Sequence, residues 1–152
     1  MAEQDSIRCI QLPLLNFQLL LPNSVVAEII SYVRPEQAGD DWLDGVMIWR
    51  GVSVPVVSVE KMCQQEHVEP GVRSRIAVIY NLHNDDEMPY LGIIMQDIPR
   101  AYLAEEERMP AQTFDADCAF LHGRADVMNS ELMIPDLDAI SEATRKKLQP
   151  MG

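Results

Sequence analysis

Apolar residues in this chain fall into short runs separated by polar turn residues, a pattern typical of β-strands. The runs of the first part lie between residues 17 and 59 and are separated by Pro, Asn, Asp and Gly: FQLLL, VVAEIISYV, GVMIW and VSVPVVSV. The second part contains RIAVIY at 75–80, YLGIIMQDI at 90–98 and shorter runs at 118–121 and 131–134. The sequence therefore predicts a mostly β protein.

A polar segment at 61–74 with a Pro-Gly turn signal separates the two sets of runs. We therefore expect one domain over residues 1–152 with two β lobes at about 15–62 and 75–135. Three short matches recur in the same order in both halves: AEI with QDI, WLDG with FLHG, and Val54-Pro55 with Ile134-Pro135. They favour a duplicated lobe, while a single irregular β-sandwich stays open as the alternative.

The tail DLDAISEATRKKL has the pattern of a helix. Its acidic residues come first, and Arg145, Lys146 and Lys147 come last, which is the order that the helix dipole prefers. We expect a C-terminal helix over about 136–148.

The segment WLDGVMIWRGVSVPVV at 42–57 predicts two strands joined by a tight turn at Arg50-Gly51, where glycine permits a positive φ. Pro55 cannot donate to a strand ladder, so we expect a sheet edge or a bulge at this position. Arg50 carries five donors in a rigid fork. It pairs inside the chain with a carboxylate such as Glu28, or it faces a partner protein, and the two interpretations are compatible.

The net charge limits the kinds of partner that the protein can bind. The chain has 24 acidic residues and 12 basic ones, which give a net charge of −12. Such a surface repels phosphate backbones and anionic lipids, so we expect neither nucleic acid binding nor direct membrane insertion. The apolar run at 12–21 is interrupted by polar residues and is too short to span a membrane. Cys9, Cys63 and Cys118 lack paired spacing, so we expect three free thiols, no disulfide and a reducing, cytoplasmic compartment.

Motifs for catalysis or metal binding are weak. Phosphate-binding glycine motifs are absent, and Ser53 lacks the second glycine and the following helix of a nucleophile elbow. Cys118 and His122 are neighbours in sequence, but the other Cys and His residues are scattered. The acidic runs 85–87 and 105–107 lack the glycine and ligand spacing of a calcium loop. We expect no catalytic residue, no metal and no cofactor, and hence a protein that is not an enzyme.

The hairpin GVMIWRGVSVPVV resembles the signature of the CheW-like coupling proteins of bacterial chemosensory systems, in which an Asn-Leu-Arg-Gly turn precedes a Val-Ile-Pro-Val strand. VVAEIISYVRPEQ resembles the family's Val-x-Glu-Ile segment, and LGIIMQDI, FLHG and LMIPDLDAI resemble its second-half landmarks, so the likeness spans residues 15–142. This resemblance implies two intertwined five-stranded SH3-like barrels. It also implies a non-catalytic scaffold that couples the cytoplasmic tip of methyl-accepting chemoreceptors to the regulatory domain of a CheA-like histidine kinase.

By the same resemblance, four residues occupy positions that bind the receptor or support that surface: Val26, Glu28, Gly45 and Arg50. Gly51 and Pro55 shape the turn. Two departures, Ile48-Trp49 in place of Asn-Leu and Gln96 in place of an Asp, suggest an accessory or divergent coupling protein of a chemosensory system linked to type IV pili, recruited to membrane receptor arrays. The rival hypotheses are a regulatory β-domain that binds a small ligand in a barrel mouth and a hydrolase with a dispersed site.

Overall fold

The structure of the chain is a computed structural model that describes residues 6–81, 88–105, 118–127 and 130–148. The strands are β1 (Ser6–Pro13), β2 (Gln18–Pro22), β3 (Val26–Ser31), β4 (Gln37–Asp40), β5 (Leu43–Trp49), β6 (Val52–Val57), β7 (Arg75–Tyr80), β8 (Tyr90–Met95), β9 (Arg100–Glu105), β10 (Leu121–Val127) and β11 (Ser130–Pro135). The helices are the 3-10 turn η1 (Asn23–Val25), α1 (Val59–Met62) and α2 (Leu137–Leu148).

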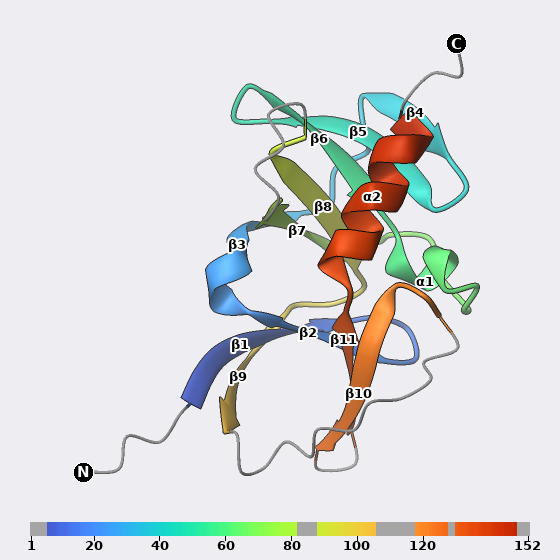
Figure 1. The fold of residues 1–152 in the computed structure, drawn as a ribbon. Helices are drawn as coiled ribbons and strands as arrows, with labels where there is room; N and C mark the ends of the chain where they lie inside the picture. Colours follow the sequence, from blue (N-terminus) through green and yellow to red (C-terminus); the bar gives the residue numbers. More distant parts are fainter. Residues whose placement is uncertain (1–5, 82–87, 106–117, 128–129, 149–152) are drawn as a thin grey trace.

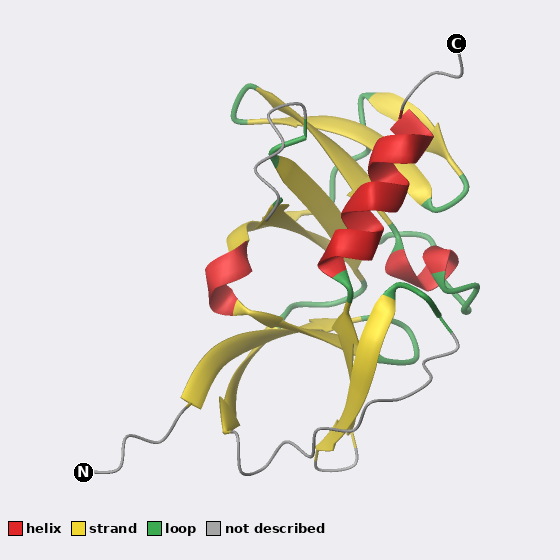
Figure 2. Ribbon diagram, in the orientation of Figure 1, coloured by secondary structure: helices red, strands yellow, loops and turns green. Residues whose placement is uncertain are grey.

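Two β-sheets form most of the molecule (Figure 1). One has five strands in the order β10-β11-β2-β1-β9, and the other has six in the order β3-β7-β8-β6-β5-β4. Figure 2 shows α2 crossing the region of the six-stranded sheet. The predicted mostly β architecture with a C-terminal helix is confirmed. The second sheet has six strands rather than five because the short, exposed β4 adds to its edge.

The two sheets are intertwined along the chain. Strands β1 and β2 from the beginning of the chain pair in one sheet with β9, β10 and β11 from its end, whereas β3 to β8 form the other. The sheets therefore do not coincide with the expected lobes at 15–62 and 75–135, and the polar connector 61–74 joins two strands of the same sheet. Turn residues mark where strands end, but pairing between distant strands, such as β2 with β11, is decided by the packing of their faces.

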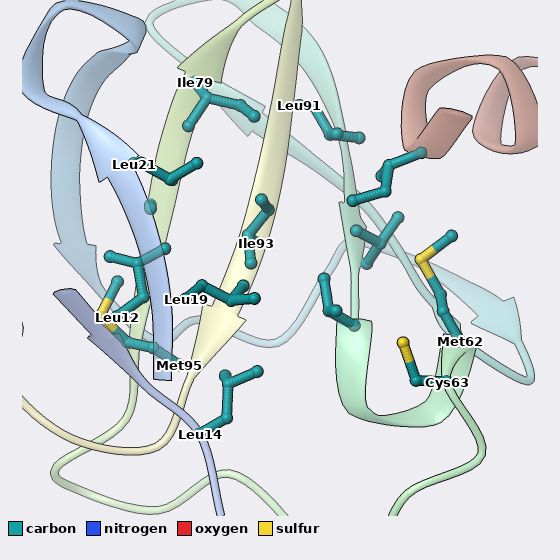
Figure 3. Packing of buried hydrophobic residues seen from close by; sticks show 14 of the residues in the cluster. Leu12, Leu14, Leu19, Leu21, Met62, Cys63, Ile79, Leu91, Ile93 and Met95 are labelled. Atoms are coloured by element: carbon teal, nitrogen blue, oxygen red, sulfur yellow. The ribbon is translucent and has the colours of Figure 1, made fainter. Parts of the chain in front are cut away.

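The larger core cluster joins the two sheets. Figure 3 shows Leu12 and Leu19 from the five-stranded sheet packing beside Ile93 and Met95 from β8. All four side chains are fully buried, and the burial of each one stabilises the fold by about 1.5–3 kcal/mol. Ile140 of α2 joins the same cluster, so the helix closes this core.

The smaller core cluster lies on the opposite face of the six-stranded sheet. Strand β7 contributes Ala77 and Ile79 to the larger cluster and Ile76 and Val78 to the smaller one. Because successive side chains of a strand point to opposite faces, β7 is buried on both sides. This explains why RIAVIY is apolar without alternation.

Pro55 does not lie at a sheet edge, because β6 is an interior strand between β5 and β8. Its parallel pairing with β8 begins only at Val56, opposite Gly92, so the missing N–H of Pro55 precedes that ladder. An irregularity in the β5–β6 pairing does occur, but it lies further along the strands, between Leu43 and Gly45.

Helix α1 joins the two sheets through one buried carboxylate. Glu60 is 1% exposed, and it accepts hydrogen bonds from the backbone N–H of Leu15 and from Gln96 Nε2, both at 2.7 Å. Leu15 lies in the turn between β1 and β2, whereas Gln96 follows β8. We call these three residues and the adjoining Cys63 the α1 junction.

The expectation of three free thiols is wrong. Cys63, at the end of α1, forms a disulfide with Cys118, just before β10, with the two Cα atoms 5.2 Å apart. The two cysteines are 55 residues apart, so their sequence spacing gave no indication that the fold brings them together. Cys9 lies buried on β1 and takes no part in this disulfide.

Helix α2 confirms the predicted C-terminal helix. Its first turn is capped by Asp136, whose carboxylate accepts a hydrogen bond from the backbone N–H of Ala139 at 3.0 Å. Its basic residues lie in the last turn, as the sequence predicted. Among the described residues, no helix is long and apolar enough to cross a membrane.

Candidate functional site

The hairpin between β5 and β6 places Arg50 at its tip. Arg50 and Gly51 both have positive φ, 50° and 78°, and Trp49 pairs directly with Val52. Two central residues with positive φ define a type I′ turn, the two-residue loop whose twist matches that of the flanking strands. The positive φ expected at Gly51 is observed, and the turn projects the Arg50 side chain, which is 68% exposed.

Glu28 of β3 lies beside this turn and is shared by two donors. Trp49 Nε1 donates to Glu28 Oε1 at 2.7 Å, and Arg50 Nη2 lies 3.5 Å from the same oxygen. The Arg50 guanidinium also lies 4.9 Å from the centroid of the Trp49 ring, within the range of a cation–π contact. The internal pairing of Arg50 with Glu28 therefore exists, and it coexists with a largely exposed guanidinium.

Two tyrosines extend this cluster. The rings of Trp49 and Tyr90 meet edge to face with centroids 4.8 Å apart, and Tyr80 lies 5.7 Å from Tyr90. Tyr80 is 45% exposed, whereas Trp49 is buried. We call Glu28, Trp49, Arg50, Tyr80 and Tyr90 the Arg50 rim. Tyrosine, tryptophan and arginine are the residue types that dominate binding energy at protein interfaces.

A sequence model of the CheW-like domain matches residues 12–145. The chain belongs to the CheW-like family. Scaffolding protein TtCheW from Thermoanaerobacter tengcongensis has a solved structure with a similar fold: the TM-score is 0.73, the identity is 17%, and the match covers 88% of this chain and 86% of that one. No curated protein matches the sequence.

The two remaining residues that the resemblance assigned to the CheW-like coupling surface, Gly45 and Val26, lie on β5 and β3. Gly45 is buried with φ 153°, and a Cβ there would meet the Gln37 carbonyl oxygen and lie 2.6 Å from Pro35 Cβ. Val26 is half-buried on β3 and packs against the larger core cluster. Of the four, the structure thus joins Glu28 and Arg50 in an ion pair, while Gly45 admits a close backbone approach and Val26 packs on the core.

The two departures from the CheW-like signature are Ile48-Trp49 and Gln96: Ile48 is 51% exposed, whereas Trp49 and Gln96 each hydrogen-bond a carboxylate. Trp49 replaces a leucine and donates to Glu28, while Gln96 replaces an aspartate and donates to the buried Glu60. An aspartate at 96 would bring a second carboxylate toward Glu60, which is costly in a buried site. Sequence reasoning noticed both departures but missed their partners, because Glu28 and Glu60 are 21 and 36 residues away.

Asp44 of β5 is another carboxylate that accepts a side-chain hydrogen bond. Tyr32 donates its hydroxyl to Asp44 Oδ2 at 2.7 Å. Burial, together with this hydrogen bond and the charge of Asp44, raises the pKa of Tyr32 far above its usual value of 10.0. The tyrosine therefore stays protonated at any physiological pH.

Other chemistry is sparse in the described part of the chain. No group of three or more His, Cys, Asp or Glu residues there is arranged to hold a metal ion. The acidic run 85–87 and residues 106–107 lie outside the described ranges. An open pocket of ≈ 210 Å³ lies near Gln18, Arg73, Asp97 and Arg100, away from the Arg50 rim. In that pocket the Arg73 guanidinium lowers the pKa of the exposed Asp97, with which it forms a 2.7 Å ion pair.

Proposed function

We propose that this CheW-like chain is a non-catalytic adaptor that couples the cytoplasmic tip of a methyl-accepting chemoreceptor to the regulatory domain of a CheA-like histidine kinase. Its membership of the CheW-like family supports a scaffolding role in chemosensory signalling. The observation that carries the proposal is the Arg50 rim, where an exposed guanidinium stands among aromatic residues at a rigid turn. In this role the protein acts in the cytoplasm and is recruited to receptor arrays at the membrane.

In this proposal the four residues that the resemblance assigned have two kinds of role, contact with the partner and support of the fold. Arg50 contacts the partner, and Glu28 of β3 forms a 3.5 Å ion pair with Arg50. Gly45 and Val26 keep the underlying strands in place, because Gly45 admits the close approach of Pro35 and Gln37 and Val26 packs on the core. Loss of Arg50 would therefore affect binding, whereas a side chain at Gly45 would disturb the fold first.

We further propose that the protein is an accessory coupling protein of a system linked to type IV pili. The two departures support this: Ile48-Trp49 alters the turn, and Gln96 alters the contact made by the buried Glu60 in the α1 junction, relative to the family's usual residues. A turn whose residues differ from the usual CheW-like signature is expected to bind a receptor that differs from the family's usual receptors.

The decisive experiment is affinity purification of the tagged protein from its native cell, followed by titration of the purified chain with each partner found. A stoichiometric complex with both a receptor tip and a kinase regulatory domain is the expected result. Native mass spectrometry of the same preparation tests the alternative, a β-domain that retains a small ligand. Recovery of neither partner, or a tightly held metabolite in their place, would contradict the adaptor role.

A further inference from the structure

We infer that Trp49 is a positioning residue of the Arg50 rim: it holds Glu28 away from full pairing with Arg50, so that the guanidinium stays available to a carboxylate on the partner. This inference rests on the proposed adaptor function and specifies the chemistry of the partner surface. It arises from a residue in which this chain departs from the usual CheW-like turn, where a leucine offers neither a donor nor a ring.

The first step is the unequal sharing of one carboxylate oxygen by two donors. The indole N–H of Trp49 reaches Glu28 Oε1 at 2.7 Å, whereas Arg50 Nη2 lies 3.5 Å from that oxygen. Strong charge-assisted hydrogen bonds between a guanidinium and a carboxylate are about 2.7–2.9 Å long and are frequently bidentate. The shorter contact is thus with Trp49, and Glu28 holds Arg50 only loosely.

The second step is the availability of the guanidinium. Arg50 has five N–H donors, and among the described residues its side chain contacts Glu28 through the long ion pair and the face of the Trp49 ring. Its side chain is 68% exposed. The positive φ of Arg50 in the type I′ turn and the ring contact restrict where the guanidinium lies. A cation that is oriented but incompletely paired is suited to a planar acceptor supplied from outside.

The third step is the surface around it. Tyr90 packs on Trp49 and Tyr80 packs on Tyr90, and Tyr80 is 45% exposed. An aromatic surface beside a guanidinium fits an apolar side chain next to a carboxylate. The partner therefore presents an aspartate or glutamate flanked by an apolar residue, although this chain as a whole carries a net charge of −12.

Trp49→Phe is the informative substitution, because it keeps an aromatic ring beside Arg50 and Tyr90 and removes the N–H, together with part of the buried ring system. Glu28 is then free to turn fully to Arg50 and to compete with the partner carboxylate. Glu28→Gln in the same background removes that competition, since a neutral amide pairs weakly with a guanidinium. Trp49 thus acts through Glu28, and a second substitution should reverse the effect of the first.

The test titrates four proteins with a fragment of the chemoreceptor tip that the wild type binds: wild type, Trp49→Phe, Trp49→Phe/Glu28→Gln and Arg50→Ala. We expect Trp49→Phe to weaken binding about fivefold and the double variant to return within about twofold of wild type. Binding should weaken with added salt in the wild type and less so in Arg50→Ala. Denaturant melts of all four establish that each is folded.

Unchanged binding by Trp49→Phe, or a loss that Glu28→Gln does not restore, would overturn the positioning role and leave Trp49 as a packing residue. Normal binding by Arg50→Ala would instead refute the proposed coupling surface. A measurement on the protein alone distinguishes the positioning role of Trp49 from the partner contact of Arg50. In nitrogen-15 NMR spectra the indole N–H signal of Trp49 should shift on Glu28→Ala, while that of Trp42 should not. An unmoved Trp49 signal would show that the indole does not hold Glu28.

Discussion

Two carboxylates, Glu28 in the Arg50 rim and Glu60 in the α1 junction, have opposite environments. Glu60 is 1% exposed and is held by two neutral donors, a backbone N–H and an amide. The side chain of Glu28 is 36% exposed and lies between an indole and a guanidinium. A buried carboxylate must be satisfied within the chain, because an unpaired one is costly, and it therefore fixes the fold. A half-exposed carboxylate such as Glu28 can pair incompletely with the exposed guanidinium of Arg50, so that this guanidinium stays available to a partner.

The largest expected effect concerns the disulfide that reinforces the α1 junction. It closes a loop with a sequence separation of 55, and a loop of this size implies a loss of about 4 kcal/mol of unfolding free energy on reduction. Denaturant melts with and without a thiol reductant measure it. Cys63→Ser/Cys118→Ser is the matched control, which should resemble the reduced protein and should not respond to reductant. Equal melts of the wild type in both buffers would mean that the disulfide does not stabilise the fold.

Removal of the buried carboxylate comes next. Glu60→Ala leaves the Leu15 N–H and the Gln96 amide without an acceptor and opens a small cavity, so the unfolding free energy should fall by about 3 kcal/mol. Partner binding by the fraction that remains folded should stay close to normal, since the α1 junction does not include the Arg50 rim. A selective loss of binding without loss of stability would reverse the roles assigned to the two carboxylates.

Arg50→Ala should show the opposite pattern. Truncation of an arginine anchor at an interface costs about 2 kcal/mol of binding free energy, whereas an exposed ion pair contributes about 0–1 kcal/mol to stability. Titration with the purified partner measures the first quantity, and a denaturant melt measures the second. Gly51→Val is the contrast, because a β-branched residue with φ near 78° strains the turn itself. Arg50 is a structural residue if its variant melts as early as Gly51→Val.

The smallest expected effect is at Tyr32. Tyr32→Phe removes the hydrogen bond to Asp44 and should lower the unfolding free energy by about 1 kcal/mol at neutral pH. The pKa of Tyr32 is raised in the folded state above 10.0, so its contribution is complete below pH 10 and declines as the pH rises further. Melts at increasing alkalinity should show wild type and variant converging. A constant difference at high pH would contradict the raised pKa.

Local features of the fold followed directly from the sequence. The alternation of apolar runs and turn residues placed most of the strands, and the order of charges placed α2 almost to the residue. The turn at Arg50-Gly51 was predictable because a glycine in a two-residue gap between apolar runs is typical of a tight hairpin. The strands β1, β4 and β9 were missed, and the run expected at 118–121 reaches only the first residue of β10. Strand β1 precedes the first expected run, β4 is exposed along its length and mostly polar, and β9 overlaps an acidic run.

The sequence alone determined the CheW-like resemblance, the mostly β class and the pair of candidate residues Glu28 and Arg50, because each depends on neighbouring residues or on a short motif. Only the tertiary structure decided which strands share a sheet, that Cys63 meets Cys118, and that Glu60 and Trp49 have partners far along the chain. These contacts depend on the packing of faces across long loops, and their energy is gained only when the whole core forms.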